Sequence, residues 1–420
     1  MTTSIGRFYD YPPALPRAGW EDISGPTHTA LYINIPFCSR FCYYCPFTKE
    51  IPKGKEHLEA YVKGVEKEMR LVANSRRHSS ARIECVYVGG GTPSLLPVSS
   101  IQGLIDNARK TFDFSEDCQI TVEANPSSAS EAFLGGLAKM GVSRVSFGVQ
   151  TFEPEGLRSL GCSHTSTQAK TAISMAQSGG LDVNVDLLYA RPGQTTTAWE
   201  NDIAVFFSTG AQHLSIYALD LVPVLPLYRH VNEGRVGRMP LLDDLRRMIE
   251  ITDEAISKNG FSRYSIDQAC VRRHENRYGL YVAGHSVIGL GAGAFSYYDG
   301  FVYRNVKASA RYLELLADGK MPVELGKKLT AHERMVRYVA KQLLFLQVDN
   351  KVFESMFGMP MEIVFQNQIC KLERKGYVEA TSDRLALTFE GRVHAFEVVR
   401  TFFSPEYELL IQKYESPKQT

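Results

Sequence analysis

The chain lacks the features that mark several large classes of protein. Its 420 residues contain 47 lysines and arginines against 46 aspartates and glutamates, so no basic excess is available to hold a nucleic-acid backbone. No apolar run reaches the roughly 18 residues that a membrane span requires. The first ten residues include no apolar segment of the kind found in secretion signals. We therefore expect a cytoplasmic protein with no nucleic-acid partner and no membrane span.

The cysteines are also too unevenly spaced for a disulfide scaffold. Three of the eight lie close together in Cys38-Ser-Arg-Phe-Cys42-Tyr-Tyr-Cys45, and the other five are scattered. A disulfide scaffold would spread its cysteines evenly through a small secreted chain, whereas clustered thiols in a reducing compartment are typical of a metal site.

What the sequence does contain is a repeated alternation of strands and helices. The expected strands cover 31–36, 83–88, 119–123, 144–148, 183–188 and 213–218, and the expected helices cover 55–74, 99–111, 129–140, 168–179 and 196–208. The strands read as continuous apolar runs, which is typical of a parallel sheet buried on both faces. Six such units in order predict an α/β fold, a partial (β/α)6 barrel of the TIM type.

The pattern changes beyond residue 219. Loops are expected at 222–227 and up to residue 281, around a helix over 242–259. Two helices, 335–346 and 361–375, followed by a hairpin over 377–389 predict a small helical domain that resembles a winged helix. Because the charge does not support DNA binding, we interpret this domain as a packing module.

The predicted organisation therefore has four parts. They are an N-terminal extension (1–28), a barrel core (29–230), a barrel extension with substrate-side loops (231–325) and the C-terminal domain (326–420).

The cysteine loop follows the first strand, at the end of the barrel where such folds place their chemistry. Thiolates are the usual ligands of iron–sulfur clusters, and Cys38, Cys42 and Cys45 would hold three irons of a [4Fe–4S] cubane. The fourth iron would then be open to the amino and carboxylate groups of S-adenosylmethionine (SAM). Two alternatives remain: a zinc site with Cys162 or His164 as the fourth ligand, or three simply buried cysteines.

The second strand ends in a glycine-rich turn, Gly89-Gly90-Gly91-Thr92-Pro93. Glycines let the backbone approach a ligand closely, and the carbonyls could accept hydrogen bonds from an ammonium group. The alternative interpretation is an ordinary tight turn. The pairing of this turn with the cysteine loop favours the cluster.

With these motifs the chain resembles the oxygen-independent coproporphyrinogen III oxidase family of radical SAM proteins, which includes heme chaperones and class C methyltransferases. The resemblance runs from about residue 31 to 403. The matching segments are 31–37 with the cysteine loop, 89–94, 123–126, 148–152, 184–189, 192–195 and 289–294.

The resemblance implies roles for individual residues. Tyr32 would pack near cluster-bound SAM, and the backbone of Gly89, Gly90, Gly91 and Thr92 would hold its amino group. Glu123, Gln150 and Asp186 would address the polar groups of one or two SAM molecules. Glu123 could instead cap a turn and Gln150 satisfy buried backbone, whereas a buried Asp186 without a partner would be costly. The electron donor implied is of the flavodoxin or ferredoxin type.

Three departures bear on the reaction. Phe47 stands where the decarboxylases carry a further cysteine, and only His274 and Tyr278 remain of the chaperones' His-Asn-x-x-Tyr-Trp motif. Cys162 stands where the family usually has an arginine, which the resemblance implies as the partner of a SAM carboxylate.

These departures lead to a hypothesis with two alternatives. The leading hypothesis is a class C type C-methyltransferase that uses two SAM molecules on an sp2 carbon of a heteroaromatic or tetrapyrrole substrate. The first alternative is a heme chaperone that binds and transfers heme. The second is an oxidative decarboxylase of the coproporphyrinogen III dehydrogenase kind.

Overall fold

The computed structural model describes residues 4–5, 11–12, 14–15, 28–75, 81–272 and 274–409. The N-terminal extension expected over 1–28 therefore lies largely outside the described residues. Its described part includes two short strands that pair with each other, β1 (Ser4–Ile5) and β2 (Ala14–Leu15).

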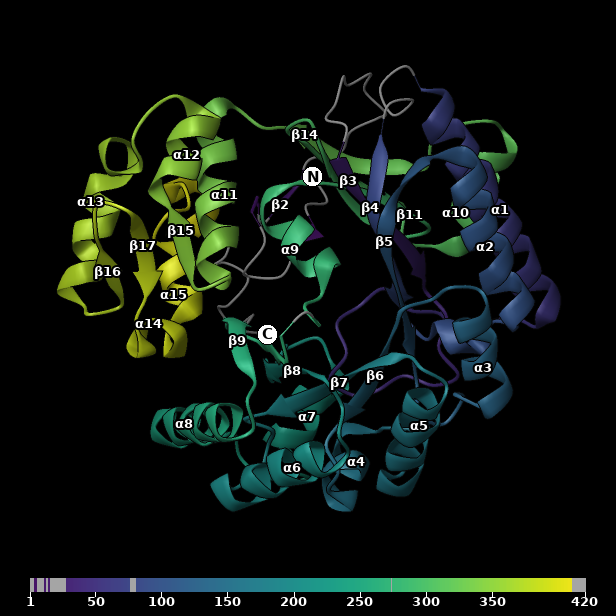
Figure 1. Cartoon of the computed structure of the whole chain (residues 1–420), viewed down its shortest axis with the longest axis horizontal. Helices are drawn as coiled ribbons and strands as arrows, with labels where there is room; N and C mark the ends of the chain where they lie inside the picture. The colour runs from purple at the N-terminus through teal and green to yellow at the C-terminus, as the bar shows by residue number, and fades with distance from the viewer. Residues whose placement is uncertain are drawn as a thin grey trace.

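A twelve-stranded sheet organises most of the chain (Figure 1). Six consecutive strands lie side by side, parallel and in chain order: β3 (His28–Ile35), β4 (Arg82–Gly90), β5 (Asp113–Ala124), β6 (Arg144–Gln150), β7 (Asp182–Tyr189) and β8 (His213–Ala218). Within the described residues the two outermost strands of the sheet do not pair with each other. The predicted α/β fold and open, partial barrel are confirmed.

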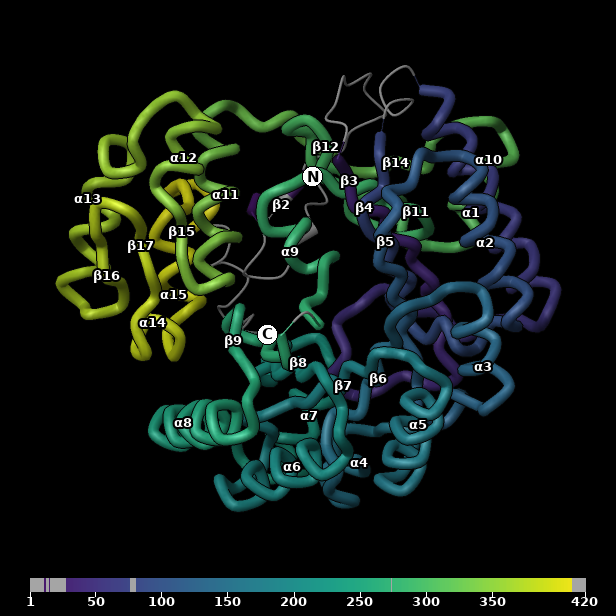
Figure 2. The backbone as a smooth tube through the Cα atoms, viewed as in Figure 1, coloured from purple at the N-terminus to yellow at the C-terminus, as the bar shows by residue number. Residues whose placement is uncertain are grey.

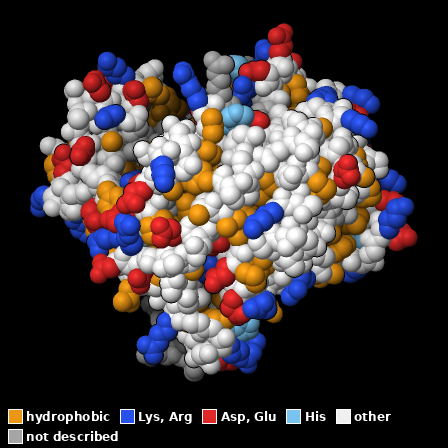
Figure 3. Space-filling model, turned by 60° about the horizontal axis from the view of Figure 1, so that its bottom comes forward, with side chains coloured by type: hydrophobic (Ala, Val, Ile, Leu, Met, Phe, Trp, Pro, Cys, Tyr) orange, Lys and Arg blue, Asp and Glu red, His pale blue; other side chains and the backbone are white. Residues whose placement is uncertain are grey.

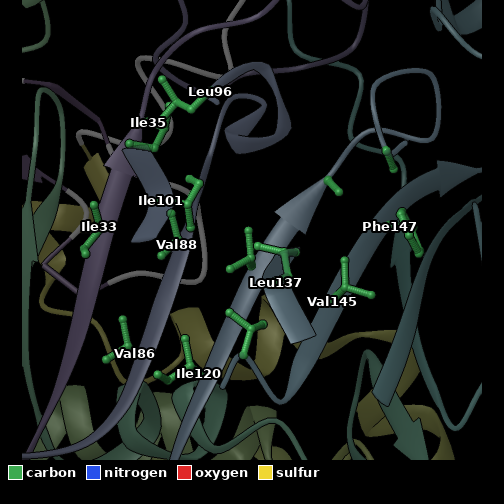
Figure 4. Packing of buried hydrophobic residues seen from close by; sticks show 14 of the residues in the cluster. Ile33, Ile35, Val86, Val88, Leu96, Ile101, Ile120, Leu137, Val145 and Phe147 are labelled. Atoms are coloured by element: carbon green, nitrogen blue, oxygen red, sulfur yellow. The ribbon is translucent and has the colours of Figure 1, made fainter. Parts of the chain in front are cut away.

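Helices connect these strands and cover the outside of the sheet. They are α1 (Lys55–Asn74), α2 (Val98–Thr111), α3 (Glu131–Lys139), α4 (Pro154–Leu160), α5 (Ser166–Ser178) and α6 (Thr196–Ser208). Figure 4 shows the apolar side chains of neighbouring strands packed with those of helices, for example Val88 beside Ile101 of α2. All five helices expected here are present, and α4, a short helix after β6, is additional.

The expectation of continuous apolar strands was wrong. In β6, Val145 and Phe147 belong to the apolar core, whereas Arg144 and Ser146 alternate with them. Since successive side chains of a strand point to opposite faces, the other face of the sheet is polar. The remaining strands repeat this alternation, and their polar side chains include Tyr32, Tyr87, Thr121, Glu123, Asn184, Asp186, His213 and Ser215. We call this face the inner face.

Additional strands extend the sheet at both ends. Beside β3 lies the parallel β11 (Ser286–Leu290), followed across the sheet by the antiparallel β12 (Phe295–Tyr298), β13 (Phe301–Asn305) and β14 (Val323–Lys328). The helix α10 (Ser309–Ala317) connects β13 to β14. Beside β8 lie the antiparallel β10 (Gln268–Cys270) and β9 (Ser262–Ser265).

Two of the expected loops contain helices. α7 (Pro226–Asn232) begins inside the loop expected at 222–227, because Pro226 occupies the first turn, where its missing N–H costs nothing. α9 (Arg277–Gly284) begins inside the loop expected up to residue 281. The helix expected over 242–259 is α8 (Leu242–Lys258).

The C-terminal segment forms a unit beside the barrel (Figure 2). Most of its buried apolar side chains belong to a cluster separate from that of the barrel. Its helices are α11 (Ala331–Leu344), α12 (Asn350–Phe357), α13 (Met361–Arg374), α14 (Phe389–Val393) and α15 (Ala395–Arg400); its strands are β15 (Gln347–Asp349), β16 (Val378–Ala380) and β17 (Arg384–Leu387). The two predicted helices and the hairpin are present. The proposed boundary at residue 326 falls within β14, so we propose that the unit begins at α11.

Ion pairs attach this unit to α8. Arg392 of α14 binds Asp253 at 2.6 Å, and Arg246 binds Glu390 at 2.9 Å.

Cationic and anionic side chains are interspersed over the face seen in Figure 3. None of the helices in the described ranges is long and apolar enough to cross a membrane.

Candidate functional site

The cysteine loop is fixed to the barrel at both of its ends. The backbone N–H of Cys38 donates to the carbonyl of Glu50 (3.0 Å), and that of Glu50 donates to the carbonyl of Pro36 (2.7 Å). At the far side of the loop, the N–H of Tyr43 donates to the carbonyl of Leu160 at the end of α4 (3.0 Å). The fold therefore holds all three cysteines at the carboxyl end of β3.

The three cysteines are half-buried, and none of them forms a disulfide among the described residues. Thr92 Oγ1 lies 3.7 Å from Cys38 Sγ, within hydrogen-bond distance for sulfur. Burial raises the pKa of Cys38 to about 11. A hydrogen bond with the Cys162 thiol lowers the pKa of Cys42 to about 7, and the side chain of Lys49 donates to the carbonyl of Cys45.

This donor set fits an iron–sulfur cluster better than a single metal ion. Among the described residues, no three His, Cys, Asp or Glu side chains converge as the ligands of one ion. A cubane distributes three thiolates over three irons and does not require that convergence. His164, a possible fourth zinc ligand, is buried with Nε2 3.0 Å from the carbonyl of Val149, whereas Cys162 does contact Cys42.

The glycine turn packs directly against the start of the cysteine loop. The N–H of Gly91 donates to the carbonyl of Ile35 (2.8 Å), and that of Thr92 donates to the carbonyl of Phe37 (2.7 Å). A Cβ on Gly91 would lie 2.6 Å from the carbonyl oxygen of Phe37. Gly90 has φ of 111°, a conformation that favours glycine. Both observations explain why this close approach needs glycine.

Glu123 joins the glycine turn to the next strand. Its carboxylate accepts hydrogen bonds from the N–H of Gly90 (2.9 Å) and from the hydroxyl of Tyr87 (2.8 Å). Gln150 ends β6 in a left-handed conformation with φ of 68°, and its side chain lies over Gly148. The structure thus brings Glu123 to the glycine turn and places Gln150 at the carboxyl end of the neighbouring strand.

Asp186 lies on the inner face in the middle of β7. It accepts hydrogen bonds from Asn184 Nδ2 (2.7 Å) and Ser146 Oγ (3.3 Å), while burial raises the pKa of the carboxyl. Asp186 is the register partner of Gly148 on the neighbouring strand β6, two residues before Gln150.

Three tyrosines stack together on the inner face. The ring of Tyr32 lies 6.0 Å from that of Tyr87 and 5.4 Å from that of Tyr278, measured between centroids. Tyr278 belongs to α9, so this helix lies against β3 and β4. The sequence analysis singled out Tyr32 and Tyr278 separately but missed Tyr87, whose signal is its alternation with Val86 and Val88.

A second polar group on the inner face connects β7 and β8. His213 Nδ1 contacts Asn184 Oδ1, and His213 Nε2 contacts the hydroxyl of Tyr264 at 2.6 Å. Burial holds the pKa of His213 well below its usual range, so the ring is neutral. Because Asn184 Nδ2 donates to Ser146 and Asp186, its oxygen accepts, and His213 therefore donates to it through Nδ1. The hydroxyl of Tyr264, which His213 Nε2 contacts, donates to Gln268 Oε1.

Arg144 was also missed by the sequence analysis. It begins β6 on the inner face and is 1% exposed, yet Nε, Nη1 and Nη2 have no hydrogen-bond partner among the described residues. An unpaired buried guanidinium is costly and unusual in a folded protein.

His274 lies at the amino-terminal end of the barrel, opposite the cysteine loop. Its Nδ1 is 3.0 Å from the carboxylate of Asp182, the first residue of β7. The side chain is 29% exposed, so it reaches the surface.

Several known proteins resemble this chain in sequence and in fold. The Radical SAM superfamily matches residues 32–205. Heme chaperone HemW of Bacillus subtilis is 29% identical over 380 residues, covering 88% of this chain and 98% of that protein. HemW of Mycobacterium tuberculosis is 30% identical over 378 residues, covering 88% and 94%.

Among solved structures, the coproporphyrinogen III oxidase HemN of Escherichia coli has a TM-score of 0.78 with 21% identity, over 90% of both chains. That likeness concerns the fold. Together with the near full-length similarity to HemW proteins, it agrees with the cysteine and glycine motifs. This chain belongs to the HemN/HemW-like family of radical SAM proteins.

Proposed function

We propose that this protein is a heme-binding radical SAM protein that acts as a heme chaperone, with heme held near His274. The observation that carries the proposal is the position of His274 Nδ1, which lies 3.0 Å from the carboxylate of Asp182 without hydrogen-bonding to it. With the carboxylate beside Nδ1, Nε2 is the nitrogen that we expect to bind iron. Histidine is a frequent axial ligand of heme.

The relatives support this choice over the methyltransferase hypothesis. The HemW proteins, similar over almost their whole length, are named heme chaperones, and Phe47 replaces the further cysteine expected of a decarboxylase. No observation on this chain favours methyl transfer specifically. The heme chaperone, given above as an alternative, therefore becomes the preferred function.

We also propose how the residues at the other end of the barrel hold their groups. Cys38, Cys42 and Cys45 would bind the [4Fe–4S] cluster, and the Gly89–Thr92 backbone, Tyr32, Glu123, Gln150 and Asp186 would surround SAM. A reduced cluster of this kind supplies an electron that cleaves a C–S bond of SAM. The chain's own contribution is to position the loop through Glu50 and Leu160 and to limit water around the half-buried thiols.

Hemin titration of the purified full-length protein, followed by absorbance, tests the proposal. We expect stoichiometric binding with a Soret band typical of histidine ligation, and a loss of affinity of about tenfold or more in His274→Ala. His332→Ala, on α11, is the matched control and should bind hemin as the wild type does. Failure of the wild type to bind hemin would reject the heme proposal.

A second experiment separates chaperone from enzyme. After anaerobic cluster reconstitution, dithionite and SAM are added and nucleoside products are separated by chromatography. Formation of 5′-deoxyadenosine that depends on Cys38 would support SAM cleavage. If S-adenosylhomocysteine forms in proportion to a methylated acceptor, the methyltransferase hypothesis is favoured over the chaperone function.

A further inference from the structure

Arg144 stands out because its charge is buried and unpaired while its polar neighbours are satisfied. All three guanidinium nitrogens lack a partner among the described residues, and the residue is 1% exposed. Nearby, Asp186 binds Asn184 and Ser146, and His213 binds Asn184 and Tyr264. These groups hydrogen-bond to one another, and none of them hydrogen-bonds to Arg144, whose charge lowers the pKa of Asp186 against the larger effect of burial.

The charge of Arg144 acts on the inner face. After burial, Arg144 is the next cause that holds the pKa of His213 down, and it also lowers the pKa of Tyr264 against the larger effect of burial. The charge of the guanidinium is therefore felt by side chains of β8 and β9 on the inner face. An arginine fork matches the two oxygens of a carboxylate, and such charge-assisted pairs are among the strongest hydrogen bonds in proteins.

The position of Arg144 connects it to the proposed heme site. Arg144 is the register partner of Asp182, the residue that contacts His274. Adjacent strands lie about 4.8 Å apart, so the backbones of these two positions are neighbours at the amino-terminal rim of the barrel. A ligand bound to His274 at the rim would therefore have its short carboxylate substituents near Arg144.

We propose that Arg144 binds a carboxylate of the ligand held in the barrel, and that this carboxylate is a propionate of the heme bound near His274. The inference rests on the proposed function. The methionyl carboxylate of SAM offers the same chemistry, but the residues proposed to surround SAM gather at the opposite, carboxyl end of the strands. The segment at 274–278 covers this part of the barrel: the N–H of Asn276 donates to the hydroxyl of Tyr264, and Gln119 donates to the carbonyl of Glu275. Entry of the propionate therefore requires this segment to move.

The test compares hemin with hemin dimethyl ester, in which both propionates are esterified. Full-length wild type, Arg144→Met, Arg144→Lys and the surface control Arg158→Met are titrated with each compound in the same detergent. We expect the wild type and Arg158→Met to bind hemin about tenfold or more tightly than the ester. Arg144→Met should lose this preference, and Arg144→Lys should keep part of it.

The outcomes distinguish the inference from the function on which it rests. If hemin binds but the preference is absent in the wild type or persists in Arg144→Met, the inference is overturned and the heme function stands. If hemin does not bind the wild type, the proposed function fails and the propionate assignment fails with it. If Arg144→Met instead weakens SAM binding to the cluster-loaded protein and leaves the hemin preference intact, the carboxylate is that of SAM and the propionate assignment is wrong.

The ligand-free protein gives an independent measurement. Replacing an unpaired buried cation with an apolar side chain of similar length removes a desolvation penalty. We therefore expect Arg144→Met to unfold at a higher temperature than the wild type in the absence of hemin and SAM. A lower unfolding temperature would show that Arg144 has a structural partner in the protein, which would overturn the inference.

Discussion

The hydroxyl of Thr92 lies 3.7 Å from the sulfur of Cys38, so the glycine turn after β4 and the cysteine loop after β3 meet at a side-chain contact as well as through their backbones. A donor to a cluster sulfur stabilises the reduced, more negative state and raises its potential.

We expect Thr92→Ala to lower the reduction potential of the reconstituted cluster by about 30–60 mV, equivalent to a hydrogen bond of about 0.7–1.4 kcal/mol. Redox titration monitored by electron paramagnetic resonance measures this shift. Thr92→Ser keeps the hydroxyl and should stay near the wild-type potential. Equal potentials in all three proteins would show that the contact does not reach the cluster.

The close packing at Gly91 predicts a strong effect of one added methyl group. Gly91→Ala would place a Cβ 2.6 Å from the carbonyl oxygen of Phe37, so the turn and the loop must separate. We expect lower iron content after reconstitution and a stability loss of about 1–3 kcal/mol. Gly135→Ala in α3, whose Cβ would meet nothing within 4 Å, should load iron normally and gain up to about 1 kcal/mol.

Glu68 predicts a pH dependence of stability. It is 1% exposed and accepts hydrogen bonds from Gly291 and Asn305 and from the hydroxyl of Tyr312, and burial raises its pKa to about 7. A raised pKa means that the folded protein binds the proton more tightly than the unfolded chain. The stabilisation from this proton is therefore complete below about pH 4.5 and is lost as the pH rises through about 7.

Urea unfolding of the wild type and Glu68→Gln at pH 5.5 and pH 8 checks this sign. The advantage of the wild type over the variant should shrink by about 1–3 kcal/mol between the two pH values, because glutamine does not ionise. An advantage that grows with pH would mean that the carboxylate is the form favoured by folding.

Arg191 and Asp202 form a buried ion pair, each 2% exposed and 3.2 Å apart. Asp202 also accepts from the N–H of Phe152 (2.7 Å), two residues after Gln150. Arg191→Met would leave this carboxylate buried without its cation, and we expect a loss of about 3–5 kcal/mol in the free energy of unfolding. Arg158→Met breaks an exposed pair and should change that free energy by less than about 1 kcal/mol.

The sequence was sufficient for the features that depend on local pattern. The cysteine spacing, the glycine turn, the first six parallel strands and the five predicted helices between them are each set by residues close together in the chain, and the structure has all of them. Strands β12 and β13 were missed although their signal is local, because they form a hairpin across Asp299-Gly300, a dipeptide typical of tight turns. Strand β14 pairs with β13 only after α10 and shows no distinctive period of its own.

The inner face shows why some site residues could not be found. In the sequence, Arg144 is an ordinary polar residue at the start of a strand. Only the assembled strands β6, β7, β8 and β9 show that its guanidinium is buried without a hydrogen-bond partner among the described residues. In the same way, nothing in the sequence places Asp182 beside His274, since 92 positions separate them in the numbering. Alternating polar residues in 144–148 and 184–186 were the available signal for a polar interior.

The pairing of β11 with β3 has a consequence for synthesis of the protein. Gly289 lies opposite Tyr32, and the side chain of Asn34 donates to the carbonyl of Ala292, so the strand before the cysteine loop is completed by a segment near residue 290. At about 5–20 residues per second, a ribosome needs roughly 12–50 s to pass from Cys45 to Ser286. The three cysteines thus leave the ribosome well before the sheet that holds them is complete, and cluster insertion into the finished fold must follow translation of the barrel extension.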